Sequence, residues 1–128
     1  DLLVTNKEIA KHHQSYSDET CYFLENVGAG RFIKKPNKMF PVAPAVRVYI
    51  LDANGTGIPD VIILAKKGLH YLIGEGKWGF SIETEKRFPQ TSPMREMSFG
   101  DINGDGFLDI LGLVAKNNNP KLWLNRVE

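Results

Sequence analysis

The sequence has one cysteine, no long apolar run and almost no net charge, and each shortage excludes a class of protein. Because Cys21 stands alone, the chain can form neither an internal disulfide nor a thiolate metal site. No apolar stretch approaches the ~18 residues of a membrane-spanning helix, and no targeting segment stands at the N-terminus. With 16 basic and 15 acidic residues the net charge is +1, so we expect no nucleic-acid partner and no membrane contact by this segment.

The sequence also lacks the long amphipathic stretches that predict helices. Its 12 glycines and seven prolines are spread along the chain and interrupt any such pattern. Short segments rich in β-branched and aromatic residues, bounded by glycine or asparagine, are typical of strands. We therefore expect one all-β domain. Its clearest predicted strands are 45–51, 61–64, 69–73, 79–83, 110–114 and 121–125.

Two acidic segments mark an internal repeat. The segment "LDANGTGIPDVIIL" begins its acidic pattern at Asp52, and "GDINGDGFLDILGL" begins its own at Asp101, 49 residues later. A second pair, "YFLENVGAGRF" and "YLIGEGKWGF", ends at Phe32 and Phe80, 48 residues apart. Two independent markers with nearly the same period indicate a propeller or solenoid repeat.

A repeat of about fifty residues has room for four strands, which is the content of a β-propeller blade. The chain then divides into a partial blade at 1–43, a complete blade at 44–92 and a partial blade at 93–128. A closed propeller needs typically 4 to 8 blades, so about 2.5 blades would leave sheet faces and edges uncovered. We therefore expect a segment of a larger closed propeller, completed by the remaining blades of a parent chain or by other chains.

The loop at 101–109 places oxygen-bearing groups at alternating positions, with glycines that allow the positive φ angles of a tight loop. The candidate ligands are Asp101, Asn103, Asp105, Asp109 and the main-chain carbonyl of Phe107. A ligand set made only of oxygen indicates calcium over zinc or copper. A helical EF-hand is excluded, because Gly112 stands where a glutamate is required and the flanks are strand-like. The alternative is a plain hairpin turn, since Asn-Gly and Asp-Gly favour turns without any metal.

The loop at 52–60 is a weaker copy of this pattern. Its candidate ligands are Asp52, Asn54, Thr56, Asp60 and the main-chain carbonyl of Ile58. Thr56 replaces a carboxylate by a neutral hydroxyl, so we expect weaker calcium binding here. Asn54 also begins an N-glycosylation sequon, and a glycan there would exclude its use as a ligand.

These segments resemble the FG-GAP or VCBS repeat, the blade unit of integrin α-subunit propellers. The loops "DANGTGIPDVIIL" and "DINGDGFLDILGL" carry the resemblance, supported by the two glycine-aromatic segments. The first loop departs from the family pattern at Thr56. The resemblance implies calcium bound in both loops, and it implies that Asp1, aligned with Asp60 and Asp109, is the last ligand of a further loop.

The resemblance also implies a function. We expect a calcium-stabilised, non-enzymatic scaffold for protein–protein recognition or cell adhesion, at a cell surface or in an extracellular or secretory compartment, with a protein partner bound through the rim loops. The alternative is a carbohydrate-binding, lectin-like propeller or an accessory module of a polysaccharide-active enzyme. Its candidate sugar-stacking residues are Trp78, Trp123, Tyr71 and Phe80, although aromatic residues more often fill the space between blades.

Overall fold

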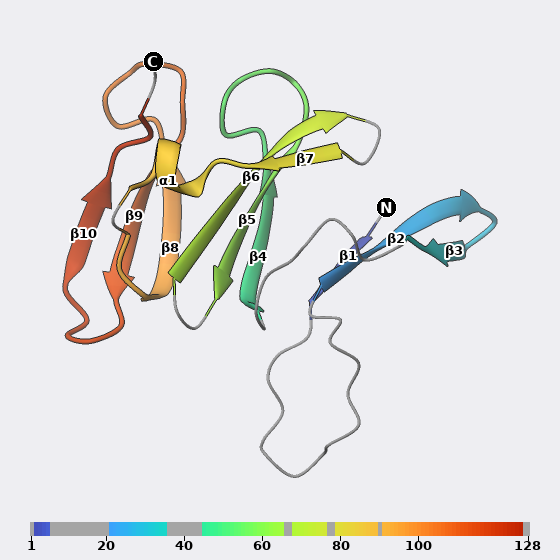
Figure 1. The fold of residues 1–128 in the computed structure, drawn as a ribbon, viewed down its shortest axis with the longest axis horizontal. Coiled ribbons are helices and arrows are strands. Elements are labelled where there is room, and N and C mark those ends of the chain that lie inside the picture. Colours follow the sequence, from blue (N-terminus) through green and yellow to red (C-terminus); the bar gives the residue numbers. More distant parts are fainter. Residues whose placement is uncertain are drawn as a thin grey trace, which may run out of the picture.

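The computed structural model describes residues 2–5, 21–35, 45–65, 68–76, 79–89 and 91–126, so Asp1 and Trp78 lie outside the described residues. The strands form three antiparallel sheets in chain order (Figure 1). The first contains β1 (Leu2–Thr5), β2 (Cys21–Gly28) and β3 (Arg31–Lys34). The second contains β4 (Ala45–Leu51), β5 (Asp60–Ala65), β6 (Gly68–Gly76) and β7 (Gly79–Ile82). The third contains β8 (Met94–Gly100), β9 (Asp109–Val114) and β10 (Pro120–Trp123).

The second sheet is a four-stranded meander with the order β4-β5-β6-β7. Its strand β5 has the sequence Asp-Val-Ile-Ile-Leu-Ala and is buried along its whole length. A continuous apolar run of this kind is typical of a strand with both faces covered. Ile62 lies opposite Tyr49 on β4 and opposite Tyr71 on β6, so bulky side chains line one face across three strands.

The third sheet repeats the plan of the second, with β9 between β8 and β10. The pairing of β8 with β9 is irregular between Met94 and Glu96, and the pairing of β4 with β5 is irregular between Ala45 and Arg47, 49 residues earlier. The two sheets therefore share a bulge as well as a strand order. Such bulges are specific features of a fold and not random defects.

The hydrophobic core lies between the second and third sheets. Its fully or nearly fully buried members are Ala53, Ile62, Leu64, Leu69, Tyr71, Phe88, Met94, Met97, Ile110 and Trp123. The ring of Tyr49 meets that of Phe99 edge to face, with 5.0 Å between ring centroids. This packing joins the two sheets into one body through apolar side chains from both.

The connection between these sheets is part of the core. After β7 the chain forms one short helix, α1 (Thr84–Arg87), followed by the buried Phe88. The Tyr71 N–H donates to Oγ1 of Thr84 at 2.9 Å, and the ring of Phe88 packs edge to face on that of Tyr71 with 5.4 Å between centroids. The linker therefore holds the third sheet against the face of the second.

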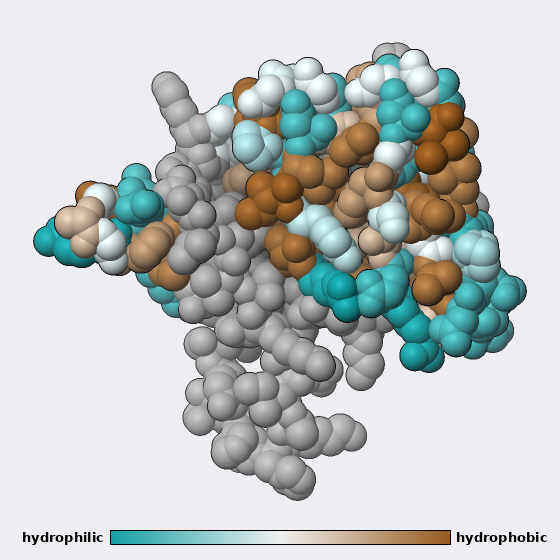
Figure 2. Space-filling view, turned by 180° about the vertical axis from the view of Figure 1, so that it is seen from behind, coloured by the Kyte–Doolittle hydropathy of each residue, from teal (hydrophilic) through white to brown (hydrophobic). Residues whose placement is uncertain are grey.

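The first sheet lies on the opposite side of the second sheet from the third and meets it through β1 and β4 (Figure 1). Seen from behind, the surface carries apolar residues grouped among polar ones (Figure 2). Large apolar side chains that remain exposed include Ile50, Ile82, Ile102, Leu111 and Leu122.

The predicted all-β class is confirmed, and the arrangement is that of part of a β-propeller. The strand β8 and the short helix α1 were not among the predicted elements. Among the described residues no helix has the length and apolar character needed to cross a membrane.

Burial lowers the pKa of His70, on β6, below its ordinary value of 6.5. The unfolded chain then binds a proton at this site more readily than the folded protein, so the free energy of unfolding should fall as pH drops below about 6.5 and level off below the folded pKa. We expect His70→Gln to remove part of this loss, measured as the difference between the two urea midpoints across that range. A difference that does not change with pH would contradict the prediction.

Candidate cation-binding loops

The two acidic loops lie at the same end of the second and third sheets (Figure 1). Loop 52–60 joins β4 to β5, and loop 101–109 joins β8 to β9. Each contains two glycines in the left-handed region: Gly55 and Gly57 have φ of 73° and 81°, and Gly104 and Gly106 have φ of 75° and 87°. Glycine reaches these angles without the penalty that a Cβ would impose, which is why both loops can curl within nine residues.

The first aspartate of each loop accepts hydrogen bonds from the turn. Oδ1 and Oδ2 of Asp52 accept the N–H groups of Thr56 and Gly57, at 3.0 and 2.8 Å. In the other loop, Asp101 Oδ1 accepts the N–H groups of Gly104 and Asp105, at 2.8 and 3.0 Å, and Oδ2 accepts that of Gly106 at 2.9 Å. The exposed first carboxylate therefore gathers the turn amides around itself.

The last aspartate of each loop is fully buried and bonds to the sheet. Asp60 accepts the Ala53 N–H at 2.9 Å on Oδ2 and the Gly74 N–H of β6 at 2.8 Å on Oδ1. Asp109 accepts the Ile102 N–H at 2.9 Å on Oδ2 and the Asn125 N–H at 2.8 Å on Oδ1. The same pattern in both repeats indicates that this carboxylate is part of the blade's construction.

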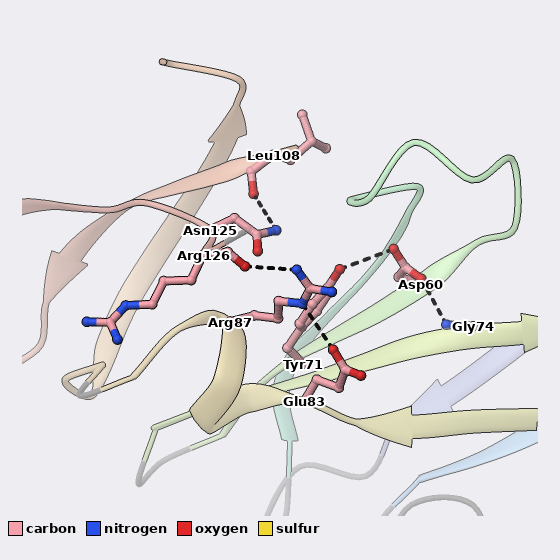
Figure 3. A network of polar contacts seen from close by, with 8 residues as sticks. All are labelled: Asp60, Tyr71, Gly74, Glu83, Arg87, Leu108, Asn125 and Arg126. Atoms are coloured by element: carbon pink, nitrogen blue, oxygen red, sulfur yellow. Dashed lines mark hydrogen bonds and ion pairs between the residues drawn. The ribbon is translucent and has the colours of Figure 1, made fainter. Parts of the chain in front are cut away.

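Asp60 also lies beside a buried tyrosine (Figure 3). The Tyr71 hydroxyl donates to Oδ2 of Asp60 at 3.4 Å. Burial raises the pKa of the Asp60 carboxyl, and the charge of Asp52 adds to the rise, although the N–H donors of Gly74 and Ala53 oppose it. Burial, reinforced by the charge of Asp60, also raises the pKa of the Tyr71 phenol, against an opposing contribution from the side chain of Asn125. Tyr71 therefore remains a hydrogen-bond donor to the carboxylate at neutral pH.

The two loops touch each other through the main chain. The Leu108 N–H donates to the carbonyl oxygen of Ala53 at 2.9 Å. Nδ2 of Asn125 donates to the Leu108 carbonyl oxygen at 3.3 Å, and its Oδ1 is buried without a partner among the described residues. A change in the conformation of one loop is thus transmitted to a main-chain contact of the other.

Arg87 closes the same region from the side of α1 (Figure 3). Its Nε donates to Oε2 of Glu83 at 3.0 Å, and its Nη1 donates to the Arg126 carbonyl oxygen at 2.8 Å. The Arg126 N–H donates in return to the Arg87 carbonyl oxygen at 2.9 Å. The Arg87 guanidinium lies over the ring of Phe107, 5.8 Å from its centroid. The end of the third sheet is therefore joined to the connection that follows the second.

The predicted ligands do not all have the same surroundings. Asp101, Asn103 and Asp105 are exposed on loop 101–109, whereas Asp109 is buried. Nδ2 of Asn103 donates to Oδ2 of Asp105 at 3.0 Å, so these two side chains are in contact. Across the described residues, which include both loops, no three histidine, cysteine, aspartate or glutamate side chains gather into a group that could hold a metal ion. The oxygen groups that remain together in this loop are thus carboxylates with an amide.

The aromatic residues considered for sugar stacking are largely used by the core. Trp123 is 7% exposed and Tyr71 is fully buried between the second and third sheets. Lys121 places its ammonium over the Trp123 ring, 5.2 Å from the centroid. Phe80, on β7, is half-buried. Neither Trp123 nor Tyr71 can therefore offer a free ring face to a sugar.

Sequence reasoning missed three partners of the loops: Tyr71, Gly74 and Asn125. Gly74 and Asn125 donate main-chain N–H groups to the buried aspartates 14 and 16 residues before them. A signal existed for Gly74, because a glycine within a strand often marks a close approach of another backbone. No side-chain pattern marks a main-chain donor, so Asn125 could be found only through its equivalence to Gly74 in the repeat.

Gly74 is expected to tolerate no side chain. A Cβ there would lie 2.0 Å from the carbonyl oxygen of Pro59, which is main chain and cannot rotate away. We expect Gly74→Ala to lower the free energy of unfolding by about 1–3 kcal/mol in urea denaturation. The matched control is Gly100→Ala, whose Cβ would meet only the Ile102 side chain at an ordinary 3.6 Å. Equal midpoints for the two variants would contradict this.

Asp109 is expected to stabilise the fold without any metal. Asp109→Ala would leave the Ile102 and Asn125 N–H groups without their acceptor, so we expect a loss of about 1–3 kcal/mol when unfolding is measured in chelator. The control is Asp105→Ala in the same loop, whose side chain is exposed and whose partners can bond to water, with an expected change within about 0.5 kcal/mol. A loss that appears for Asp109→Ala only when calcium is added would overturn this role.

Comparison with known proteins agrees with the repeat. Residues 52–112 match the family described as an FG-GAP-like repeat. The match begins at the first aspartate of loop 52–60, includes all of loop 101–109 and ends within β9. No curated protein and no solved structure matches the chain. The segment from Asp52 to Gly112, which holds both acidic loops, thus belongs to the FG-GAP-like repeat family.

Proposed function

We propose that this chain is part of a calcium-stabilised β-propeller scaffold that recognises a protein partner at a cell surface or in an extracellular or secretory compartment. The observation that carries the proposal is the shared construction of the two loops. Each has an exposed first aspartate that organises the turn and a buried last aspartate that bonds to the sheet. The Leu108–Ala53 hydrogen bond joins them into one rim surface.

Loop 101–109 has a donor set that fits calcium. Asp101, Asn103 and Asp105 present carboxylate and amide oxygens to solvent, and the main-chain carbonyl of Phe107 can add a further oxygen. Each oxygen of Asp109 accepts a single N–H group, and a carboxylate oxygen has two lone pairs. Asp109 therefore keeps acceptor capacity for a cation while it holds the loop to the sheet. These five residues are the ones that would hold the ion.

Loop 52–60 is the poorer site of the two. Oδ2 of Asp60 already accepts both the Ala53 N–H and the Tyr71 hydroxyl. The Thr56 hydroxyl donates to Oδ1 of Asn54 at 2.9 Å and accepts the Ile58 N–H at 3.3 Å. Fewer oxygens are available here, and one carboxylate is missing, so we propose weaker binding of calcium in this loop.

A bound calcium ion would supply positive charge against the repulsion of the loop carboxylates. The chain itself supplies the rigidity that recognition needs. The buried aspartates bond to strands, the Arg87 network joins the two sheets, and the exposed loop residues are left to face a partner. We propose binding and not catalysis, because the two buried loop carboxylates are engaged by main-chain N–H donors and are not placed to exchange protons with a substrate.

The test is isothermal titration calorimetry of the full chain with calcium chloride. We expect one tighter event, assigned to loop 101–109, that Asp105→Asn weakens by about tenfold or more because a charged ligand is lost. The control is Glu96→Gln, which removes an exposed carboxylate on β8 outside the loops. The absence of a binding event in the parent, or an equal effect of the two variants, would overturn the calcium site.

The same titration can test the ranking of the loops. Thr56→Asp restores the carboxylate that loop 101–109 has at Asp105, 49 residues later in the repeat. We expect this variant to show a stronger second event than the parent. A second event that is unchanged or lost would contradict the explanation based on the number of charged ligands.

A further inference from the structure

One face of the third sheet carries four exposed leucines. Leu111 and Leu113 on β9 are 48% and 38% exposed, and Leu122 on β10 and Leu124 just after it are 42% and 46% exposed. We call these four residues the leucine face. Single exposed apolar residues are normal on a protein surface, but a contiguous group on neighbouring strands marks an interaction site.

The strand register places these leucines on one side of the sheet. Leu111 lies directly opposite Leu122, and alternate residues of a strand share a face. Leu113 and Leu124 therefore flank the Leu111–Leu122 pair. On the other side of the same strands, Ile110 and Trp123 are buried in the core. The third sheet is thus apolar on both faces and covered on one.

The repeat shows how the equivalent face of the second sheet is used. Leu111 and Leu113 stand 49 residues after Ile62 and Leu64, at the same positions of β9 and β5. Tyr71 lies opposite Ile62 as Leu122 lies opposite Leu111. The three residues of the second sheet are fully buried against the third sheet. The same face is therefore buried in one repeat and exposed in the next.

What covers the face of the second sheet is also known. Met94, Met97, Ile110 and Trp123 of the third sheet pack on it. We propose that the leucine face is the docking surface for a further sheet of the same FG-GAP-like repeat, which presents apolar residues at the positions of these four. The second and third sheets are the template for this contact, because they show one repeat packing on the next with the chain order preserved.

The inference deepens the scaffold proposal by naming a partner, but it rests on the packing of the sheets and not on calcium. A further repeat would continue the order of sheets by the same step that relates the second to the third. A second copy of the whole chain is a different occupant, and the experiment below separates the two.

The test extends the full chain with one more repeat unit in register. Position 128 corresponds to position 79 at the 49-residue period, so a second copy of residues 80–128 placed after Glu128 continues the pattern. This addition supplies new copies of β8, β9 and β10 to the leucine face. Parent and extended chains are then compared with and without the double substitution Leu111→Asn and Leu122→Asn, in chelator, so that failure of the calcium proposal leaves the result readable.

In the parent we expect the double substitution to shift the thermal midpoint by no more than about 2 °C, because both side chains are exposed. In the extended chain we expect the same change to lower the midpoint by about 5 °C or more, since both positions become buried. The matched control is Ile50→Asn on β4, a position 55% exposed and outside the leucine face, which should have an equal, small effect in both chains.

Two results would overturn the proposal. One is an equal effect of the double substitution in the parent and the extended chain. The other is self-association, measured by analytical ultracentrifugation, that needs Leu111 and Leu122 and persists after the extension, because a second copy would then be the occupant. Self-association of the parent that the extension abolishes supports the proposal.

Discussion

The packing of the second sheet against the third is the contact on which the other features of the structure depend. The strand β5 is buried on both faces, so it is stable only when another layer covers each of them. The third sheet supplies one layer through Met97, Ile110 and Trp123. With the sheets fixed in this way, the ends of β4 and β8 lie next to each other, and the two acidic loops meet at the Leu108–Ala53 hydrogen bond.

The buried aspartates are the electrostatic counterpart of this packing. A carboxylate removed from water is destabilised, and the raised pKa of Asp60 reflects that cost. The cost is offset because each buried oxygen receives a main-chain N–H donor, from the loop on one side and from the sheet on the other. The same two bonds fix the exit of the loop relative to the strand. A loop built in this way has little freedom where it enters the sheet and more at its exposed tip.

Much of this architecture could be predicted from the sequence, for identifiable reasons. The strand 45–51 was predicted with the bounds of β4, because alternation and β-branched residues mark it clearly. The strand β8 was missed, although it lies 49 residues after β4, because its bulge at Met94 and Glu96 breaks the two-residue period. The inward direction of Asp60 and Asp109 could not be predicted, since their sheet partners are main-chain N–H groups that carry no sequence signature. The side chain of Asp1 and that of Trp78 belong to predictions outside the described residues.

The structure separates the acidic residues of each loop into two kinds, and this separation bears on how an ion would act. Asp109 is tied to the sheet by bonds that need no metal, whereas Asp101, Asn103 and Asp105 are exposed. An ion bound by the exposed groups would therefore order the tip of a loop whose base is already fixed. Since the tip is the part that faces a partner, calcium would influence recognition more than folding. The fold would depend chiefly on the covering of sheet faces, which is why the exposed leucines of the third sheet, and not the acidic loops, mark where another repeat belongs.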